Sequence, residues 1–133
     1  MSASVASPLV CVVDDDELMR GALQGLLKEA GFPARAFVSG EAFLSSGAQH
    51  LSSCLIADVS MPGMSGLDLQ ARLNAEQIRI PVIFITAHGA ERMRMRALKA
   101  GAVAFLAKPF DDEVLLRSVR AAVGAGHPGG GEA

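Results

Sequence analysis

The feature that most constrains the fold of this chain is an alternation of short aliphatic runs with longer segments of helical period. Five such pairs, each a run followed by a helical segment, can be traced along the sequence. The runs are almost continuously apolar, which is typical of strands buried on both faces of a parallel sheet. Because parallel strands need crossover connections, the pattern predicts βαβ units. We therefore expect an α/β domain with helices on both faces of a parallel sheet.

Strands are expected at residues 9–13, 34–38, 53–57, 81–86 and 102–107. Helices are expected at about 17–30, after Ser39, from Ser65, at about 90–100, and from Asp111. Apolar residues at helical spacing should face the core from these helices. They are Met19, Leu23, Leu26, Leu27, Ala30, Ala42, Phe43, Leu44, Leu67, Ala71, Leu73, Leu115, Val119, Ala122 and Val123.

The length of 133 residues suits one domain. We expect a flexible leader at residues 1–8, a folded domain at 9–123, and a Gly-rich tail or linker start at 124–133, where the composition cannot hold a helix. The leader lacks Lys and Arg, and the apolar run after it ends at Asp14, so neither a signal peptide nor a membrane span is expected.

The charge and the cysteines narrow the function classes. A net charge of -2 gives no broad positive field, so direct nucleic-acid binding by this segment is disfavoured. Cys11 and Cys54 lie in apolar runs without the spacing of a zinc site, which indicates inert core thiols. Thiols of that kind suit a reducing cytoplasm, the expected location.

Polar side chains stand where four of the predicted strands end. Asp14 and Asp15 follow the first strand and Asp58 the third, while Thr86 closes the fourth and Lys108 follows the fifth. The carboxyl ends of parallel strands share one edge of the sheet, where open α/β sheets bind ligands. These residues are therefore expected to converge on one acidic pocket with a single ammonium group.

Three carboxylates in one pocket repel one another, and a bound cation would relieve that repulsion. Mg²⁺ suits such a site because it prefers a few carboxylate oxygens and keeps room for a phosphate oxygen, and Mn²⁺ is an alternative. A carboxylate can attack a phosphoryl donor if the charge of the transferred group is neutralised. The residues thus favour a phosphoryl acceptor site.

Four motifs in this order resemble the receiver domains of two-component response regulators. They are Val13-Asp14-Asp15-Asp16, the segment from Asp58 to Gly66, Ile85-Thr86-Ala87 and Lys108-Pro109-Phe110. The resemblance implies a flavodoxin-like sheet in the strand order 2-1-3-4-5 with right-handed crossovers. It also implies a signalling switch rather than an enzyme, since such a domain catalyses only its own phosphorylation and dephosphorylation.

By this resemblance, Asp58 is the phosphoacceptor and receives its phosphoryl group from a sensor histidine kinase in a Mg²⁺-dependent reaction. Asp15 is a direct metal ligand, Asp14 acts mainly through metal-bound water, and the Ser60 backbone carbonyl completes the set. Lys108 pairs with the phosphoryl group or with Asp58, and its bond to Pro109 is implied to be cis. Thr86 and Phe105 form the switch pair.

The segments 84–89 and 95–105 look like the FixJ type of receiver, which usually precedes a helix-turn-helix output domain. Such a domain either lies beyond the tail in a longer parent chain, or the receiver acts alone through another protein. Dimerisation through the surface of the fourth helix, fifth strand and fifth helix is implied on phosphorylation. His88 is interpreted as an exposed loop histidine without a catalytic role.

Two other functions share features with the sequence. A haloacid-dehalogenase-like phosphatase would use Asp14 as its nucleophile, but position 18 is Leu and no later strand supplies its last acidic motif. A flavodoxin-like module that binds flavin mononucleotide would need Ser, Thr and Gly in the first loop. Here that loop is Asp14-Asp15-Asp16, which would repel a phosphate.

Overall fold

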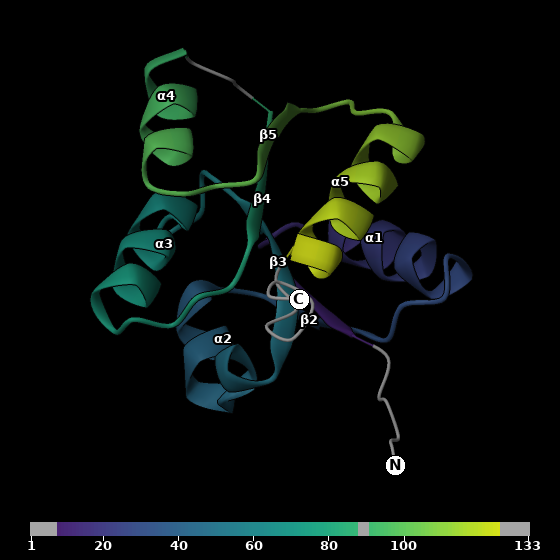
Figure 1. Ribbon diagram of the computed structural model, residues 1–133, viewed down its shortest axis with the longest axis horizontal. Coiled ribbons are helices and arrows are strands. Elements are labelled where there is room, and N and C mark those ends of the chain that lie inside the picture. The colour runs from purple at the N-terminus through teal and green to yellow at the C-terminus, as the bar shows by residue number, and fades with distance from the viewer. Residues whose placement is uncertain (1–7, 88–90, 126–133) are drawn as a thin grey trace.

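The computed structural model describes residues 8–87 and 91–125 and contains one parallel sheet of five strands. The strands are β1 (Leu9–Val13), β2 (Ala34–Phe37), β3 (Ser52–Asp58), β4 (Val82–Thr86) and β5 (Ala104–Ala107). Their order in the sheet is β2-β1-β3-β4-β5, as expected from the resemblance (Figure 1). β3 is therefore the central strand, and Asp58 is its last residue.

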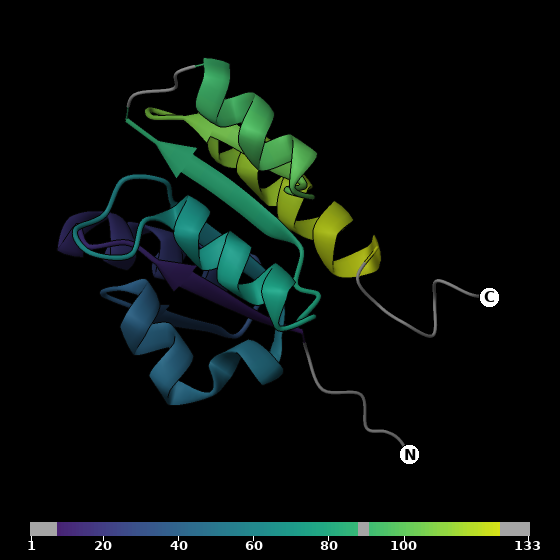
Figure 2. The same cartoon turned by 90° about the vertical axis from the view of Figure 1, so that its left-hand side faces the viewer.

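Within the described residues, five helices cover the two faces of the sheet. They are α1 (Glu17–Glu29), α2 (Gly40–Ser46), α3 (Gly66–Ala75), α4 (Glu91–Lys99) and α5 (Asp112–Ala125), with a short 3₁₀ helix η1 (Ala48–His50) between α2 and β3. Helices α1 and α5 lie on one face, and α2, α3 and α4 lie on the other (Figures 1 and 2). None of the helices within residues 8–87 and 91–125 has both the length and the apolar character that crossing a lipid bilayer requires.

Alternate residues of the strands feed two separate hydrophobic cores, one under each layer of helices. Val10, Val12 and Ile56 pack with α1 and α5, whereas Cys11, Leu55 and Phe84 pack with the helices of the other face. Every apolar residue expected to face the core from α1 and α5 contacts one of these cores, and so do Phe43 and Leu44 of α2. This arrangement holds both layers to the central strands and leaves the ends of those strands open for a site.

Both cysteines are buried free thiols, as predicted. Burial raises the pKa of both, and that of Cys54 reaches about 12. They therefore remain protonated and unreactive at neutral pH.

Side-chain caps explain where the helices begin. Asp16 accepts a hydrogen bond from the Leu18 amide at the start of α1, and Ser39 does the same for the Ala42 amide at α2. A capping box joins Ser65 and Asp68 at the start of α3, as their spacing predicts. Asp111 accepts from the Glu113 amide at the start of α5.

Several expected boundaries shift by one or two residues. β5 begins at Ala104 rather than 102, because the Ala102 amide donates to Ala97 O and so belongs to the end of α4. β4 begins after Pro81, which has no amide hydrogen for a ladder. The predicted helix 90–100 appears as Glu91–Lys99, and Ala90 lies outside the described residues.

Two expectations about helices were wrong. Ala71 is exposed, because α3 turns Leu67, Leu69, Gln70 and Leu73 toward the sheet instead. α5 continues to Ala125, two residues into the segment predicted to be a tail. One glycine costs a helix only about 1 kcal/mol, so Gly124 does not end it. The division into 1–8, 9–123 and 124–133 otherwise stays a prediction.

Candidate phosphoacceptor and metal site

Asp14 and Asp58 reach the same edge of the sheet because β1 and β3 are adjacent and parallel. β1 pairs with β3 up to Val13 and Ala57, and the residue that follows each of these two in the sequence is an aspartate at this edge. The Asp14 amide donates to Phe37 O at 3.1 Å, and the Val59 amide donates to Ile85 O at 3.1 Å. These backbone bonds tie both loop beginnings to the neighbouring strands.

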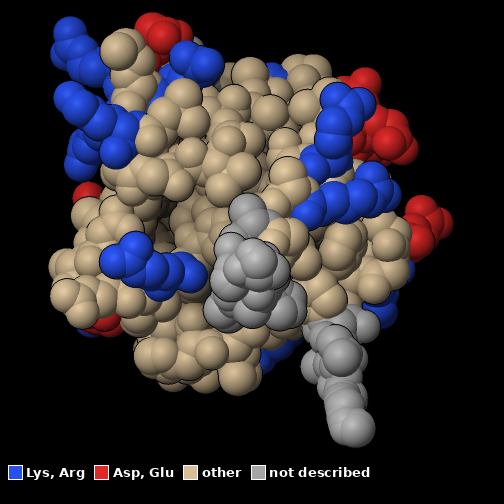
Figure 3. All heavy atoms as spheres, viewed as in Figure 1, with Lys and Arg blue, Asp and Glu red and all other residues tan. Residues whose placement is uncertain are grey.

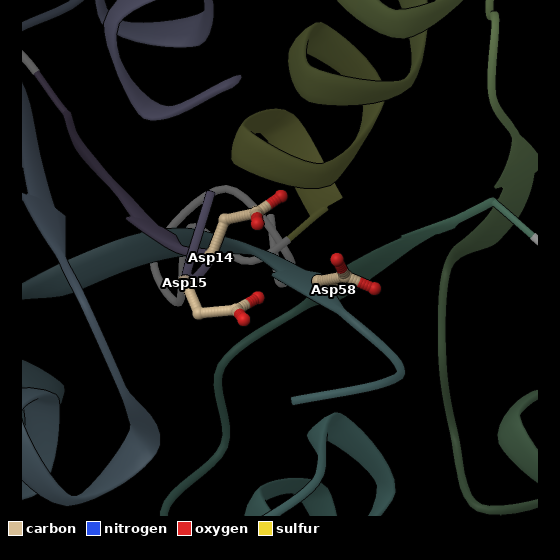
Figure 4. A group of neighbouring side chains, drawn as sticks. All are labelled: Asp14, Asp15 and Asp58. Carbon is tan, nitrogen blue, oxygen red and sulfur yellow. The ribbon is translucent and has the colours of Figure 1, made fainter. Parts of the chain in front are cut away.

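Three carboxylates gather at this edge, from Asp14, Asp15 and Asp58 (Figure 4). Each offers an oxygen, and these oxygens all lie within 4.8 Å of one another. Asp14 is completely buried, Asp58 is only 7% exposed, and Asp15 is exposed. The cluster of three carboxylates is therefore open to solvent at Asp15, whereas Asp14 and Asp58 are shielded from solvent.

Lys108 lies between the two buried carboxylates. Its Nζ is 3.2 Å from Asp58 Oδ2 and 3.4 Å from Asp14 Oδ2. Its amide donates to Thr86 O at 2.8 Å, and its bond to Pro109 is cis, as the resemblance implied. Lys108 follows β5, and its ammonium thus lies beside carboxylates that are 50 and 94 residues away in the sequence.

The electrostatics of the site follow from this burial. Burial raises the pKa of Asp14, and the nearby Asp58 charge adds to the rise, although the Asp16 amide and Lys108 oppose it. Burial works against the charge of Lys108, but its bonds to Asp58 and Asp14 outweigh this and raise its pKa. One ammonium thus leaves an excess of negative charge among three carboxylates.

An excess of closely spaced carboxylate oxygens is the donor set that a hard divalent cation prefers. The residues present therefore fit a metal ion of that kind, as the sequence predicted. A ligand set of oxygens alone favours Mg²⁺ or Mn²⁺ over zinc, which prefers nitrogen and sulfur.

The loop after β3 is held close to Asp58. The Ser60 amide donates to Asp58 Oδ1 at 3.0 Å, and the Gly66 amide donates to Val59 O at 2.9 Å. A Cβ atom at position 66 would overlap the Asp58 carbonyl oxygen and lie 3.0 Å from the Phe84 ring. Only glycine allows α3 to start this close to the acidic residue.

The two expected switch residues lie on neighbouring strands. Thr86 is the last residue of β4 and is 1% exposed. Phe105 is half-buried on β5, and its ring centroid lies 6.3 Å from that of Phe84. His88 lies outside the described residues.

One contact to the site was not predicted from the sequence. The guanidinium of Arg20 donates from Nη1 to the backbone oxygen of Asp14 at 2.9 Å. Arg20 lies in the first turn of α1, and its side chain is half-buried. Only its position, one turn into the helix after an acidic loop, could have suggested the contact.

This fold and this site define a class of signalling domains. The family model for the response regulator receiver domain matches residues 10–120, so the chain belongs to that family. It is a receiver domain of the two-component systems, as the motifs predicted. The full burial of Asp14, with hydrogen bonds to both of its oxygens, disfavours the alternative in which it is a phosphatase nucleophile.

Individual relatives support the FixJ type. Nodulation protein W of Bradyrhizobium diazoefficiens is 48% identical over 114 residues, which are 86% of this chain and 50% of that protein. Transcriptional regulatory protein FixJ of Azorhizobium caulinodans is 42% identical over 115 residues, 86% of this chain and 54% of that protein. The crystal structure of FixJ-N has a TM-score of 0.81 at 39% identity, covering 90% of this chain and 95% of that one. The chain spans about half the length of the curated relatives it matches.

Proposed function

We propose that the chain accepts a phosphoryl group on Asp58 from a sensor histidine kinase, in a reaction that needs Mg²⁺. The observation that carries this proposal is the position of Asp58 at the end of the central strand. There its carboxylate lies beside those of Asp14 and Asp15 and 3.2 Å from the Lys108 ammonium. A nucleophilic oxygen, metal ligands and a cation for the transferred group are thus within reach of one another.

Asp14, Asp15 and Asp58, with the Ser60 backbone carbonyl, are the residues that would hold the ion, and Mn²⁺ could replace Mg²⁺. When bound, the ion would neutralise negative charge on the transferred group. Lys108 supports the same role, because its ammonium already pairs with the Asp58 carboxylate. Burial is the main cause of the raised pKa of Asp14, and binding of the ion would relieve the repulsion from Asp58 that adds to it.

In the transfer, a carboxylate oxygen of Asp58 forms a bond to phosphorus while the bond from phosphorus to the donor's histidine nitrogen breaks. The product is an acyl phosphate on Asp58, and the histidine leaves with its electron pair. Thr86 ends the strand next to β3. Its hydroxyl is the group that we propose would donate a hydrogen bond to a phosphoryl oxygen on Asp58. The domain acts as a switch and turns over no other substrate.

The proposed output of the switch is a changed surface. Movement of Thr86 toward the phosphoryl group would let Phe105 turn inward, which alters the face formed by α4, β5 and α5. A partner protein or a second copy of the chain would bind that face. We propose a cytoplasmic location for this segment. We propose no direct binding of nucleic acid or membrane by it.

Mass spectrometry after treatment with acetyl phosphate and Mg²⁺ tests the phosphoacceptor. We expect one phosphoryl group, mapped to the peptide that contains Asp58, and no added mass in Asp58→Asn or without Mg²⁺. Asp68→Asn is the matched control, since Asp68 is an exposed carboxylate in α3 and should leave labelling intact. Labelling that survives Asp58→Asn would refute the assignment.

Gel filtration with and without beryllofluoride, a mimic of the phosphoryl group, tests dimerisation. An earlier elution with the mimic is expected for the wild type and not for Asp58→Asn. An unchanged elution volume would count against a dimer as the output.

A further inference from the structure

Arg20 makes a contact that the phosphoryl transfer does not itself require. Its Nη1 donates to Asp14 O at 2.9 Å, and that oxygen belongs to the peptide bond joining Asp14 to Asp15. The contact therefore reaches the link between two of the three clustered carboxylates. It comes from a helix, whereas the link itself lies in a loop.

The peptide after Asp14 determines where Asp15 lies. A peptide unit is planar, so fixing its carbonyl oxygen also fixes the amide and Cα of the next residue. Asp14 is already held by its amide, which donates to Phe37 O, and by its side chain, which accepts from the Asp16 amide at 2.9 Å. Asp15, by contrast, is exposed. The Arg20 contact supplies a third point of attachment at the peptide that leads into it.

Arg20 lies on a helix that is firmly attached to the rest of the domain. Its own amide donates to Asp16 O at 3.0 Å in the first turn of α1, and Asp16 caps that helix through the Leu18 amide. Leu23 and Leu27 then fix α1 to the sheet. The guanidinium is thus held by a packed helix against the loop that it contacts.

We propose that Arg20 is a positioning residue for the divalent cation: it holds the Asp14–Asp15 peptide so that both carboxylates face Asp58. The inference rests on the proposed function, because it assigns Arg20 to the metal site of that function. It acts through the backbone of Asp14, and contact with the ion itself is not required.

An electrostatic role and a positioning role for Arg20 predict opposite changes in metal affinity when its side chain is replaced. A guanidinium beside the site repels a cation, so loss of its charge alone would tighten binding. Loss of the hydrogen bond would instead let the Asp14–Asp15 peptide rotate and weaken binding. The sign of the change in metal affinity therefore separates a positioning role from a purely electrostatic one.

Titration with Mn²⁺, followed by the electron paramagnetic resonance signal of the free ion, measures this affinity directly. Arg20→Met keeps the aliphatic stem but removes the donor and the charge. We expect its Kd for Mn²⁺ to rise by about tenfold, as is usual when a group that orients a metal ligand is lost. Arg20→Lys keeps the charge and one donor group, and should recover part of the affinity. Arg120→Met, on an exposed position of α5, is the matched control and should bind like the wild type.

Phosphorylation by acetyl phosphate at a series of Mg²⁺ concentrations gives a second measurement. Arg20→Met should need more Mg²⁺ for half-maximal labelling but reach the wild-type rate at saturation, whereas general damage would lower that rate. Thermal melting with and without Mg²⁺ shows whether each variant folds. If Arg20→Met does not fold, the Kd of Arg20→Lys for Mn²⁺ decides whether Arg20 has a positioning role.

Equal or tighter Mn²⁺ binding by a folded Arg20→Met would overturn the inference while leaving the proposed function intact. A wild-type chain that binds no Mn²⁺ and takes no label would overturn the proposed function itself. The two failures are therefore distinguishable in one set of titrations.

Discussion

Helices α3 and α4 lie next to each other on the same face of the sheet, yet they are attached to the domain in different ways. α3 buries Leu67, Leu69 and Leu73 as well as Gly66 and Gln70. Within Glu91–Lys99, Ala97 alone is buried, and basic residues line the solvent side. Figure 3 shows Lys and Arg side chains gathered at the corner that α4 occupies in Figure 1.

Side-chain amides of α3 add to the few apolar anchors of α4, which are Ala97 and the partly buried Met93. Gln70 Nε2 donates to Ala97 O at 3.1 Å, and Asn74 Nδ2 donates to Ala100 O at 3.0 Å. Buried leucines stabilise α3 by a large, non-directional effect, whereas each amide bond contributes only about 1 kcal/mol. We infer that, of the two helices, α4 separates from the domain at the lower free energy, which suits the surface change that we propose for the phosphorylated state.

The largest effect should come from the apolar anchor of α3. Leu69→Ala is expected to lower the free energy of unfolding by about 2 to 5 kcal/mol, because it leaves a cavity in the core. Leu98→Ala, in the half-buried part of α4, is the matched change and should cost less than half as much. Chemical denaturation followed by circular dichroism measures both. Equal losses would mean that α4 is anchored as firmly as α3.

A smaller and more local effect is expected from the amide that joins the two helices. Gln70→Met keeps the length of the side chain but removes the donor to Ala97 O. The free energy for opening the α4 amides should fall by about 1 kcal/mol, with little change in α3. Native-state hydrogen exchange measures this, and Gln24→Met, at a half-buried position of α1, controls for the replacement of a helical glutamine by methionine. A uniform loss of protection over the whole domain would contradict the local role.

The smallest effect concerns the first turn of α3. Hydrogen bonds from Ser65 lower the pKa of Asp68 below its ordinary value. A lowered folded-state pKa means that this group stabilises the fold above the unfolded pKa of about 3.9, and that the contribution is lost as the pH falls further. Asp68→Asn should therefore reduce the acid dependence of stability below about pH 4. Denaturation curves at a series of acidic pH values measure this slope, and an unchanged slope would exclude the cap as its source.

The sequence predicted the sheet and the gathering of the carboxylates well, because both follow from strand ends that parallel pairing must bring to one edge. Asp14, Asp58 and Lys108 are the clearest examples. The face of α3 was harder to predict. Ala71 continues an apolar spacing from Leu67, but the helix is rotated so that polar Gln70 is buried, and hydrophobic periodicity cannot anticipate a buried amide.

Contacts from a side chain to a backbone oxygen were also beyond sequence reasoning. Arg20 and Asn74 both make such bonds, and any residue type can supply the carbonyl. Their partners depend on how a loop or helix end is oriented in space. Residue patterns record that orientation only weakly.

The close approach at Gly66 has a consequence for sequence variation. Substitution at position 66 is limited by space, because any side chain would meet the Asp58 carbonyl. Gly101 has open space around it, so substitution there is limited only by its φ of +107°. Asparagine and aspartate tolerate positive φ better than other residues, so they should survive at 101 at some cost. A library with both codons randomised, selected for folding, should return glycine alone at 66 and a mixed population at 101.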